Sequence, residues 1–111
     1  MRVLHDGEVL AAEVEVADTA LARARGLMFR RSVPDDYALV FRFGDAGRRS
    51  VHMLFVPFPL DVLWLVDGTV QRVRRLRPWV GLGFGRADTL VELPAGAADG
   101  VGTGDAVVVA E

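Results

Sequence analysis

Two residues in one apolar stretch could perform acid–base chemistry together. His52 and Asp61 are nine positions apart in the segment VHMLFVPFPLDVLWL, residues 51–65, which is otherwise almost wholly apolar. An imidazole held beside a carboxylate can exchange protons near neutral pH, and an arginine such as Arg30 could hold an anionic substrate. Nine extended residues span up to about 30 Å, so the pair can meet only if the chain bends back at the two prolines between them. One hypothesis is therefore a hydrolase or isomerase that uses His52 and Asp61 with Arg30.

The same two residues also have a structural interpretation. A neutral His52 at a strand can satisfy both ring nitrogens on backbone groups and water, and a buried Asp61 needs charge-assisted hydrogen bonds. We expect Asp61 to accept them from backbone amides or from an arginine, with Arg30 and Arg77 as the candidates. Nothing in the sequence requires the prolines to bring His52 and Asp61 together. The structural interpretation is therefore the one that we favour.

Other catalytic and metal-binding patterns are weaker. Ser32 or Ser50 could complete a triad with His52 and Asp61, but neither serine lies in a nucleophile elbow. A metal site would have to draw on scattered ligands, namely His5, His52, Asp61 and Glu92. We expect an exposed His5 at a hairpin turn, a hydrogen-bonded His52, no metal and no cofactor. The glycines of residues 81–85 lack the following helix of a phosphate-binding loop, so we interpret them as a mobile loop.

The composition narrows the class of protein. The chain has 111 residues, a net charge of −2, thirteen arginines without a lysine, and no cysteine. This length predicts a single domain over residues 1–111, and the charge does not indicate a nucleic-acid binder. The arginine-rich residues 72–77 are interpreted as a solvated strand face. No apolar run approaches the roughly 20 residues of a membrane span and no signal peptide is visible, so we expect a cytoplasmic monomer without a membrane partner.

Turn and cap signals predict the local elements. Asp-Gly pairs at 6–7 and 67–68, each flanked by strand-like runs, predict two hairpins. Further strands are expected at residues 37–43, 51–55, 60–66, 89–93 and 105–110, with a break at the prolines that include Pro59. Residues 19–25 predict a helix with Asp18 as its N-cap and Gly26 at its end with positive φ. A second helical turn is expected at residues 95–100.

These elements favour a mainly β fold. Short strands, two hairpins and few helices are typical of a compact antiparallel sandwich or a distorted barrel. The fold class that we predict adds one short N-terminal helix and a second helical turn near the C-terminus.

Six fragments in a fixed order carry a family resemblance. They are EVADT at 15–19, RGLMFR at 25–30, Met53 with PLD at 59–61, RPW at 77–79, VELPAG at 91–96 and GDAV at 104–107. In this order, over about residues 9–109, the chain resembles the family known as domain of unknown function 192. The resemblance implies a compact, mainly β domain with one early helix and supplies no activity. Many relatives have Trp-Met-Lys-Asn-Thr where this chain has residues 52–56, so a ligand of those polar side chains is not implied here.

The sequence favours a small non-enzymatic binding or accessory module whose partner is a small molecule or a protein. A further alternative is a protein-interaction module that uses the loop of residues 78–84, with Trp79 and Phe84 as anchors. The candidate ligand-binding residues are Arg30, His52, Asp61, Arg77 and Trp79. The residues to which we assign structural roles are Asp18, Gly26, Met28, Pro59, Glu92 and Gly96.

Overall fold

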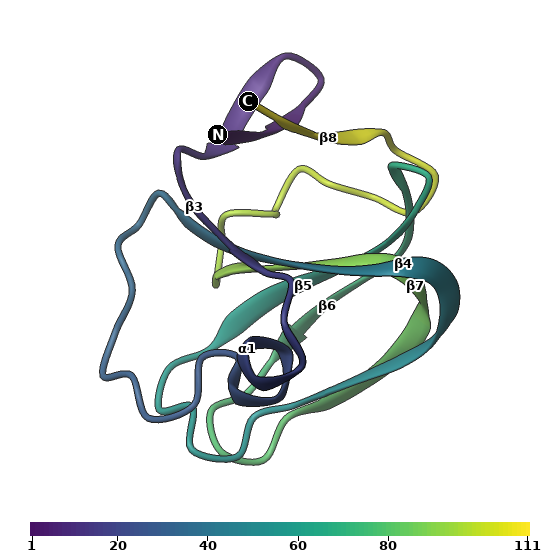
Figure 1. Cartoon of the computed structure of the whole chain (residues 1–111). Coiled ribbons are helices and arrows are strands. Elements are labelled where there is room, and N and C mark those ends of the chain that lie inside the picture. Colours follow the sequence, from purple (N-terminus) through teal and green to yellow (C-terminus); the bar gives the residue numbers. More distant parts are fainter.

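The computed structural model describes all 111 residues and contains two sheets that pack against each other (Figure 1). The smaller sheet has the order β2-β1-β8, and the larger sheet has the order β3-β4-β7-β5-β6. The bounds are β1 Arg2–His5, β2 Glu8–Ala11, β3 Glu13–Ala17, α1 Ala20–Arg25, β4 Tyr37–His52, β5 Leu60–Val66, β6 Thr69–Leu76, β7 Leu82–Pro94 and β8 Val107–Ala110. The mainly β prediction is confirmed. The larger sheet stays open, and its β3–β4 pair is parallel, so the fold is not purely antiparallel.

Both predicted Asp-Gly hairpins are confirmed. Asp6 and Gly7 connect β1 to β2, and Asp67 and Gly68 connect β5 to β6, with positive φ at all four residues. Two consecutive positive φ angles are the signature of a tight turn whose twist matches the flanking strands. The strand predicted at 60–66 is also confirmed, and the prolines lie in the break before it.

The long pair β4–β7 was not predicted. These strands have 16 and 13 residues and run antiparallel over nearly their whole length, with an irregularity between Arg42 and Gly47. The pair bends there, and in Figure 1 the two ribbons curve back over β5 and β6. β4 ends at His52, so the strand predicted at 51–55 is confirmed only at its first two residues, and Leu54 and Phe55 form a turn. The predicted mobile loop at 81–85 is also wrong, because Leu82 already begins β7.

Trp64 explains the glycines at the start of β7. Its indole is fully buried and donates a hydrogen bond from Nε1 to the carbonyl of Arg49 at 3.0 Å. A Cβ atom on Gly83 or on Gly85 would lie 2.7 Å from the indole ring, closer than side chains pack. The glycines therefore let the bent part of β7 pass directly over Trp64.

We expect Gly85→Ala to destabilise the protein by about 1–3 kcal/mol, because an added methyl group forces an overpacked core to shift. Urea unfolding of the variant measures the loss. Gly100→Ala is the matched control, since no atom lies within 4 Å of the position of its Cβ. Equal stability of the two variants would contradict the role of Gly85.

The helix begins one residue later than predicted. Thr19, not Asp18, is the N-cap, because the Thr19 hydroxyl accepts a hydrogen bond from the amide of Ala22. The carbonyl of Asp18 instead accepts from the Arg23 guanidinium at 2.8 Å. Gly26 ends the helix with φ +51°, as predicted.

The helical turn predicted at residues 95–100 is a series of tight turns. Its backbone bonds connect residues three apart, from Ala97 to Pro94, from Asp99 to Gly96 and from Val101 to Ala98. The amides of Gly96 and Ala98 are not available for helical bonds, because both donate to the carboxylate of Asp61. A side chain from β5 thus determines the shape of this segment.

The larger sheet has two buried faces, and one of them positions the candidate site. Its outer face packs against the smaller sheet through side chains such as Val40, Leu63 and Val91. Its inner, concave face carries the cluster of Phe41, Leu60 and Trp64, with α1 and the segment after it lying over the opening. Glu92 lies in register with Leu39 on β4 and Val62 on β5 and shares this concave face. A carboxyl group therefore points into an apolar interior.

Candidate functional site

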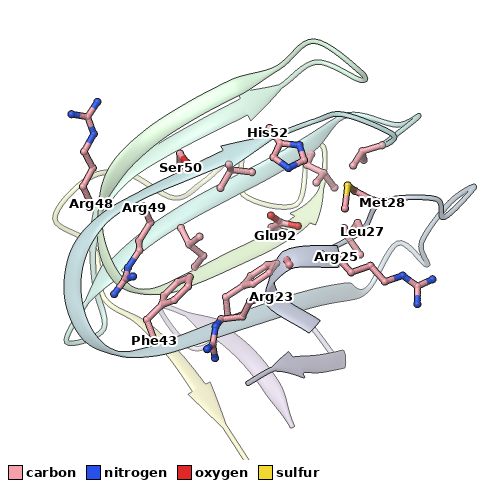
Figure 2. A pocket seen from close by; sticks show the side chains of 17 residues that line it. Arg23, Arg25, Leu27, Met28, Phe43, Arg48, Arg49, Ser50, His52 and Glu92 are labelled. Carbon is pink, nitrogen blue, oxygen red and sulfur yellow. The ribbon is translucent and has the colours of Figure 1, made fainter. Parts of the chain in front are cut away.

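A hollow of about 240 Å³ lies under the concave face of the larger sheet, with Glu92 inside it (Figure 2). Its walls are mostly apolar. They come from the end of α1 and the segment after it, from β4, from Val56 in the segment between β4 and β5, from Leu60 of β5, and from two residues of β7. The apolar side chains of the walls include those of Leu27, Phe41, Val56 and Leu90. We call this hollow the Glu92 pocket.

Glu92 is the unusual group in this pocket. Its side chain is only 6 % exposed, and burial raises its pKa to about 8. Burial is the only influence on this pKa, because no hydrogen bond and no neighbouring cation stabilises the carboxylate. At neutral pH the carboxyl group is therefore mostly protonated and has a hydrogen bond to donate with no partner in the protein. A perturbed buried acid in a pocket is a marker of a functional site.

The mouth of the pocket carries two arginines around one aromatic ring. The guanidinium carbons of Arg23 and Arg49 lie 5.8 and 4.1 Å from the ring centroid of Phe43. Backbone carbonyls hold both side chains in place, and Arg49 also pairs with Asp45 at 3.2 Å. Arg23 has no carboxylate partner, and in Figure 2 its side chain lies beside Phe43 below Glu92. The mouth is thus positively charged while the interior is apolar.

His52 lines the same pocket. Its ring lies above Glu92 in Figure 2, near Met28. The Nδ1 atom of His52 accepts a hydrogen bond from the amide of Leu54 at 3.2 Å, so the predicted hydrogen-bonded histidine is confirmed. Met28 is half-buried and packs against the concave cluster. His52 is a wall residue of the pocket with one nitrogen already engaged.

Asp61 lies elsewhere, with a full set of partners. It is 2 % exposed and accepts from Arg75 Nε at 2.8 Å, from Gly96 N at 2.9 Å and from Ala98 N at 3.1 Å. The prediction of a buried, charge-assisted Asp61 is confirmed, but the named arginines are wrong. Arg75 is the partner, because the register of β5 and β6 places it directly opposite Asp61.

The two arginines expected at Asp61 lie in other surroundings. Arg30 forms a two-point ion pair with Glu15, with the closer contact at 2.9 Å, and its guanidinium lies over the ring of Tyr37. Arg77 is exposed at the end of β6, and Pro59 is exposed just before β5. Of His52, Asp61 and Arg30, only His52 lines the Glu92 pocket. The three residues of the hydrolase or isomerase hypothesis therefore do not share one site.

The candidate metal ligands are also dispersed. His5 is 8 % exposed, so the expectation of an exposed His5 is wrong; its Nε2 lies 2.9 Å from a carboxylate oxygen of Asp105. The structure holds no group of three His, Cys, Asp or Glu side chains placed to bind one ion. Glu92 lies in the Glu92 pocket, and Asp61 lies among its donors Arg75, Gly96 and Ala98.

Trp79 belongs to an exposed aromatic cluster that three separate loops build. The ring of Phe55 stacks on Phe29 with centroids 4.9 Å apart and meets Trp79 edge-on at 5.7 Å. Phe29 is 67 % exposed and Trp79 is 50 % exposed. All three residues have positive φ, between +60° and +71°, a strained conformation for aromatic residues. Phe84 is not part of the cluster, because it lies in β7 against Arg48.

Sequence reasoning assigned Glu92 a structural role, named it otherwise only as a possible metal ligand, and missed the arginines at the pocket mouth. A usable signal was present in TLVELP, where one carboxylate interrupts an apolar strand and shares a face with Leu90. A charged residue on the buried face of a strand is either paired or functional. The fragments RGLMFR, PLD and VELPAG, on which the family resemblance rests, each contribute residues to the pocket wall.

Comparisons with known proteins place the chain among relatives without an assigned activity. The model of the family described as DUF192, Uncharacterized ACR, matches residues 1–109. A UPF0127 protein of Thermococcus sibiricus is 37 % identical over 97 residues, which are 84 % of this chain and 62 % of that protein. A UPF0127 protein of Pyrococcus horikoshii is 36 % identical over 88 residues, 76 % of this chain and 74 % of that protein. This chain thus spans less than two thirds of the length of the Thermococcus relative.

Two solved structures share the fold. One is a protein of Sinorhizobium meliloti 1021 described as a "putative transcription regulator", with a TM-score of 0.84 and 28 % sequence identity. The match covers 96 % of this chain and 89 % of that chain. A protein of unknown function from Novosphingobium aromaticivorans has a TM-score of 0.78 and 25 % identity, over 86 % and 74 % of the two chains. No helix in the structure of this chain is long and apolar enough to cross a membrane.

Proposed function

Because this chain belongs to the family of domain of unknown function 192, whose name assigns no activity, we propose its function from the Glu92 pocket: it is a non-enzymatic module that binds a small organic anion with an apolar body. The observation that carries the proposal is the unpartnered carboxyl group of Glu92. Tyr37 Oη is the one fully buried side-chain polar atom without a partner, so the Glu92 oxygens open into the hollow, where a ligand oxygen can accept the Glu92 proton. We also propose that the module works in the cytoplasm as a monomer.

The walls and the mouth of the pocket define the class of ligand. A volume of about 240 Å³ lies below the usual range for drug-sized ligands and suits roughly ten heavy atoms. The apolar walls favour a hydrocarbon ring or chain, and Arg23 at the mouth favours an anionic end group. A carbonyl or ether oxygen at the other end would accept from Glu92. An amine is disfavoured, because it would have to pass the arginines and ionise Glu92.

The probe 4-oxocyclohexanecarboxylate combines these three features and tests the proposal. In a ¹⁵N NMR titration at pH 7, we expect it to shift the amides of Leu27, Val51 and Glu92. Glu92→Leu removes the donor and should weaken binding at least about tenfold, the effect of one lost hydrogen bond. Glu92→Gln keeps an N–H donor and should stay within a few-fold of wild type.

Two controls accompany this titration. Glu8→Leu makes the same change at an exposed position and should leave the affinity unchanged. Cyclohexylamine has a similar ring with the opposite charge and should not bind. The proposed function is wrong if the probe shifts only amides outside the Glu92 pocket. It is also wrong if wild type and Glu92→Leu bind 4-oxocyclohexanecarboxylate with equal affinity.

The exposed aromatic cluster supports a second candidate function, recognition of a protein partner. Three strained, exposed and mutually stacked rings are costly unless they meet another surface, and aromatic anchors dominate such interfaces. Peptides selected from a random display library should bind the wild type in fluorescence polarisation. They should lose affinity in Trp79→Ser and keep it in Phe84→Ser, a matched change at an exposed ring outside the cluster. Selected peptides that ignore Trp79→Ser would remove this candidate.

A further inference from the structure

A second hollow, of about 460 Å³, lies on the outer surface where β4, β6 and β7 come together. Three arginines and a glutamine line it around one aromatic ring, namely Arg48, Arg72, Arg86, Gln71 and Phe84. Arg48 also borders the Glu92 pocket and is the one residue that lines both hollows, but Figure 2 shows its side chain pointing away from Glu92. We call this second hollow the arginine–Phe84 hollow.

The arginines of this hollow lack acidic partners. Arg48 and Arg86 are direct partners across β4 and β7, an arrangement in which like charges destabilise a sheet. None of the three arginines forms an ion pair with a carboxylate, whereas Arg30, Arg49 and Arg75 each do. The hollow therefore concentrates positive charge in a protein whose net charge is −2.

The acidic residue closest along β7 is already engaged. The carboxylate of Asp88 accepts from the amide of Asp67 at 3.0 Å and from the hydroxyl of Thr89 at 2.9 Å. An anion from outside would thus relieve the repulsion between Arg48 and Arg86 that the protein itself leaves in place.

The aromatic ring and the arginines hold one another in position. The guanidinium carbon of Arg48 lies 5.0 Å from the ring centroid of Phe84. Nη1 of Arg72 donates to the carbonyl of Phe84 at 2.6 Å, which fixes Arg72 beside the ring. Phe84 remains 38 % exposed, so a flat group can contact it. An arginine–aromatic pair of this kind offers a stacking surface next to donors that suit phosphate oxygens.

We propose that the arginine–Phe84 hollow binds a nucleoside diphosphate or triphosphate. The phosphates contact Arg48 and Arg86, Arg72 contributes a third positive charge, and the base stacks against Phe84 and the Arg48 guanidinium. This ligand is favoured over a single-stranded nucleic acid, because a strand needs a charged groove several nucleotides long and these cations occupy one hollow. The proposal uses none of the residues that carry the Glu92 pocket proposal.

Isothermal titration of the full chain in 150 mM NaCl, with ADP, pyrophosphate and adenosine as probes, tests the proposal. ADP should bind, pyrophosphate should bind at least about fivefold more weakly, and adenosine should not bind. The double variant Arg48→Gln/Arg86→Gln should weaken ADP binding at least about tenfold. Arg2→Gln, which removes one exposed arginine of the smaller sheet, should change nothing.

Phe84→Leu separates stacking from charge. It should reduce ADP affinity to about the level of pyrophosphate and change pyrophosphate affinity by less than about twofold, since the backbone carbonyl of residue 84 still holds Arg72. These side chains are exposed or partly exposed, and an unchanged melting temperature will show that the variants are folded. The proposal is wrong if ADP binds no better than pyrophosphate, if the double variant binds ADP like wild type, or if a uridine oligonucleotide binds more tightly than ADP.

Discussion

Glu92→Gln is expected to remove a large pH dependence from the stability of this protein. The pKa of Glu92 is raised from 4.5 to about 8 in the folded state. Between these values the folded protein keeps a proton that the unfolded chain releases, so the stability of the wild type falls as the pH rises through this window. One pKa unit corresponds to about 1.4 kcal/mol, so the full loss is roughly 3–5 kcal/mol. A glutamine cannot ionise and does not suffer this loss.

Urea unfolding at five pH values from 5 to 9 measures the effect. The difference in unfolding free energy between Glu92→Gln and wild type should grow steadily in favour of the variant and level off above about pH 8. Taking this difference cancels the titration of all other groups. The exposed Glu8→Gln should show no such trend. Parallel curves for Glu92→Gln and wild type would show that Glu92 ionises as freely as an exposed glutamate.

Asp61→Asn is expected to cost about 2–4 kcal/mol of unfolding free energy. The aspartate receives two hydrogen bonds from Arg75 and two from backbone amides, all at a buried carboxylate. An asparagine has one acceptor oxygen and must turn its NH₂ group toward a donor. A buried donor then loses its partner, which is among the costly classes of substitution.

Asp99→Asn is the matched control for this change. Asp99 also pairs with Arg75, but its side chain is exposed, and such pairs contribute little to stability. We expect a change below about 1 kcal/mol. In Asp61→Ala, which removes both oxygens, hydrogen exchange at the amides of Gly96 and Ala98 should also become faster, because both donate to one oxygen of Asp61. A variant as stable as wild type with unchanged exchange would contradict the role assigned to Asp61.

Local signals predicted the local parts of this fold. The two Asp-Gly hairpins, the strand at 60–66 and the glycine at the helix end each depend on residues within a few positions of one another. The burial of Asp61 was also predictable, because a carboxylate inside an apolar strand must find partners. Its partner was not, since only the register of β5 and β6 places Arg75 rather than Arg30 or Arg77 opposite it.

The parts that the sequence did not reveal depend on distant contacts. Gly83 and Gly85 looked like a mobile loop, and their role becomes visible only when Trp64 lies beneath them. The bend of β4 and β7 comes from an irregularity between Arg42 and Gly47, where Gly44 has φ +86°. The residues Gly-Asp-Ala-Gly at 44–47 are a turn signal, but they do not show that the same strand continues beyond the bend. Glu92 is isolated because this bend folds the sheet over it, so its pKa could not be anticipated from the strand that carries it.

A ¹³C NMR titration of the Glu92 side chain, with and without 4-oxocyclohexanecarboxylate, tests the Glu92 pocket most directly. Without the probe we expect a pKa of about 8. With the probe bound, the pKa should rise further, because a ligand that accepts the Glu92 proton must by linkage hold that proton more tightly. A Glu92 carboxyl group that titrates near its ordinary value and does not respond to the probe would contradict the account.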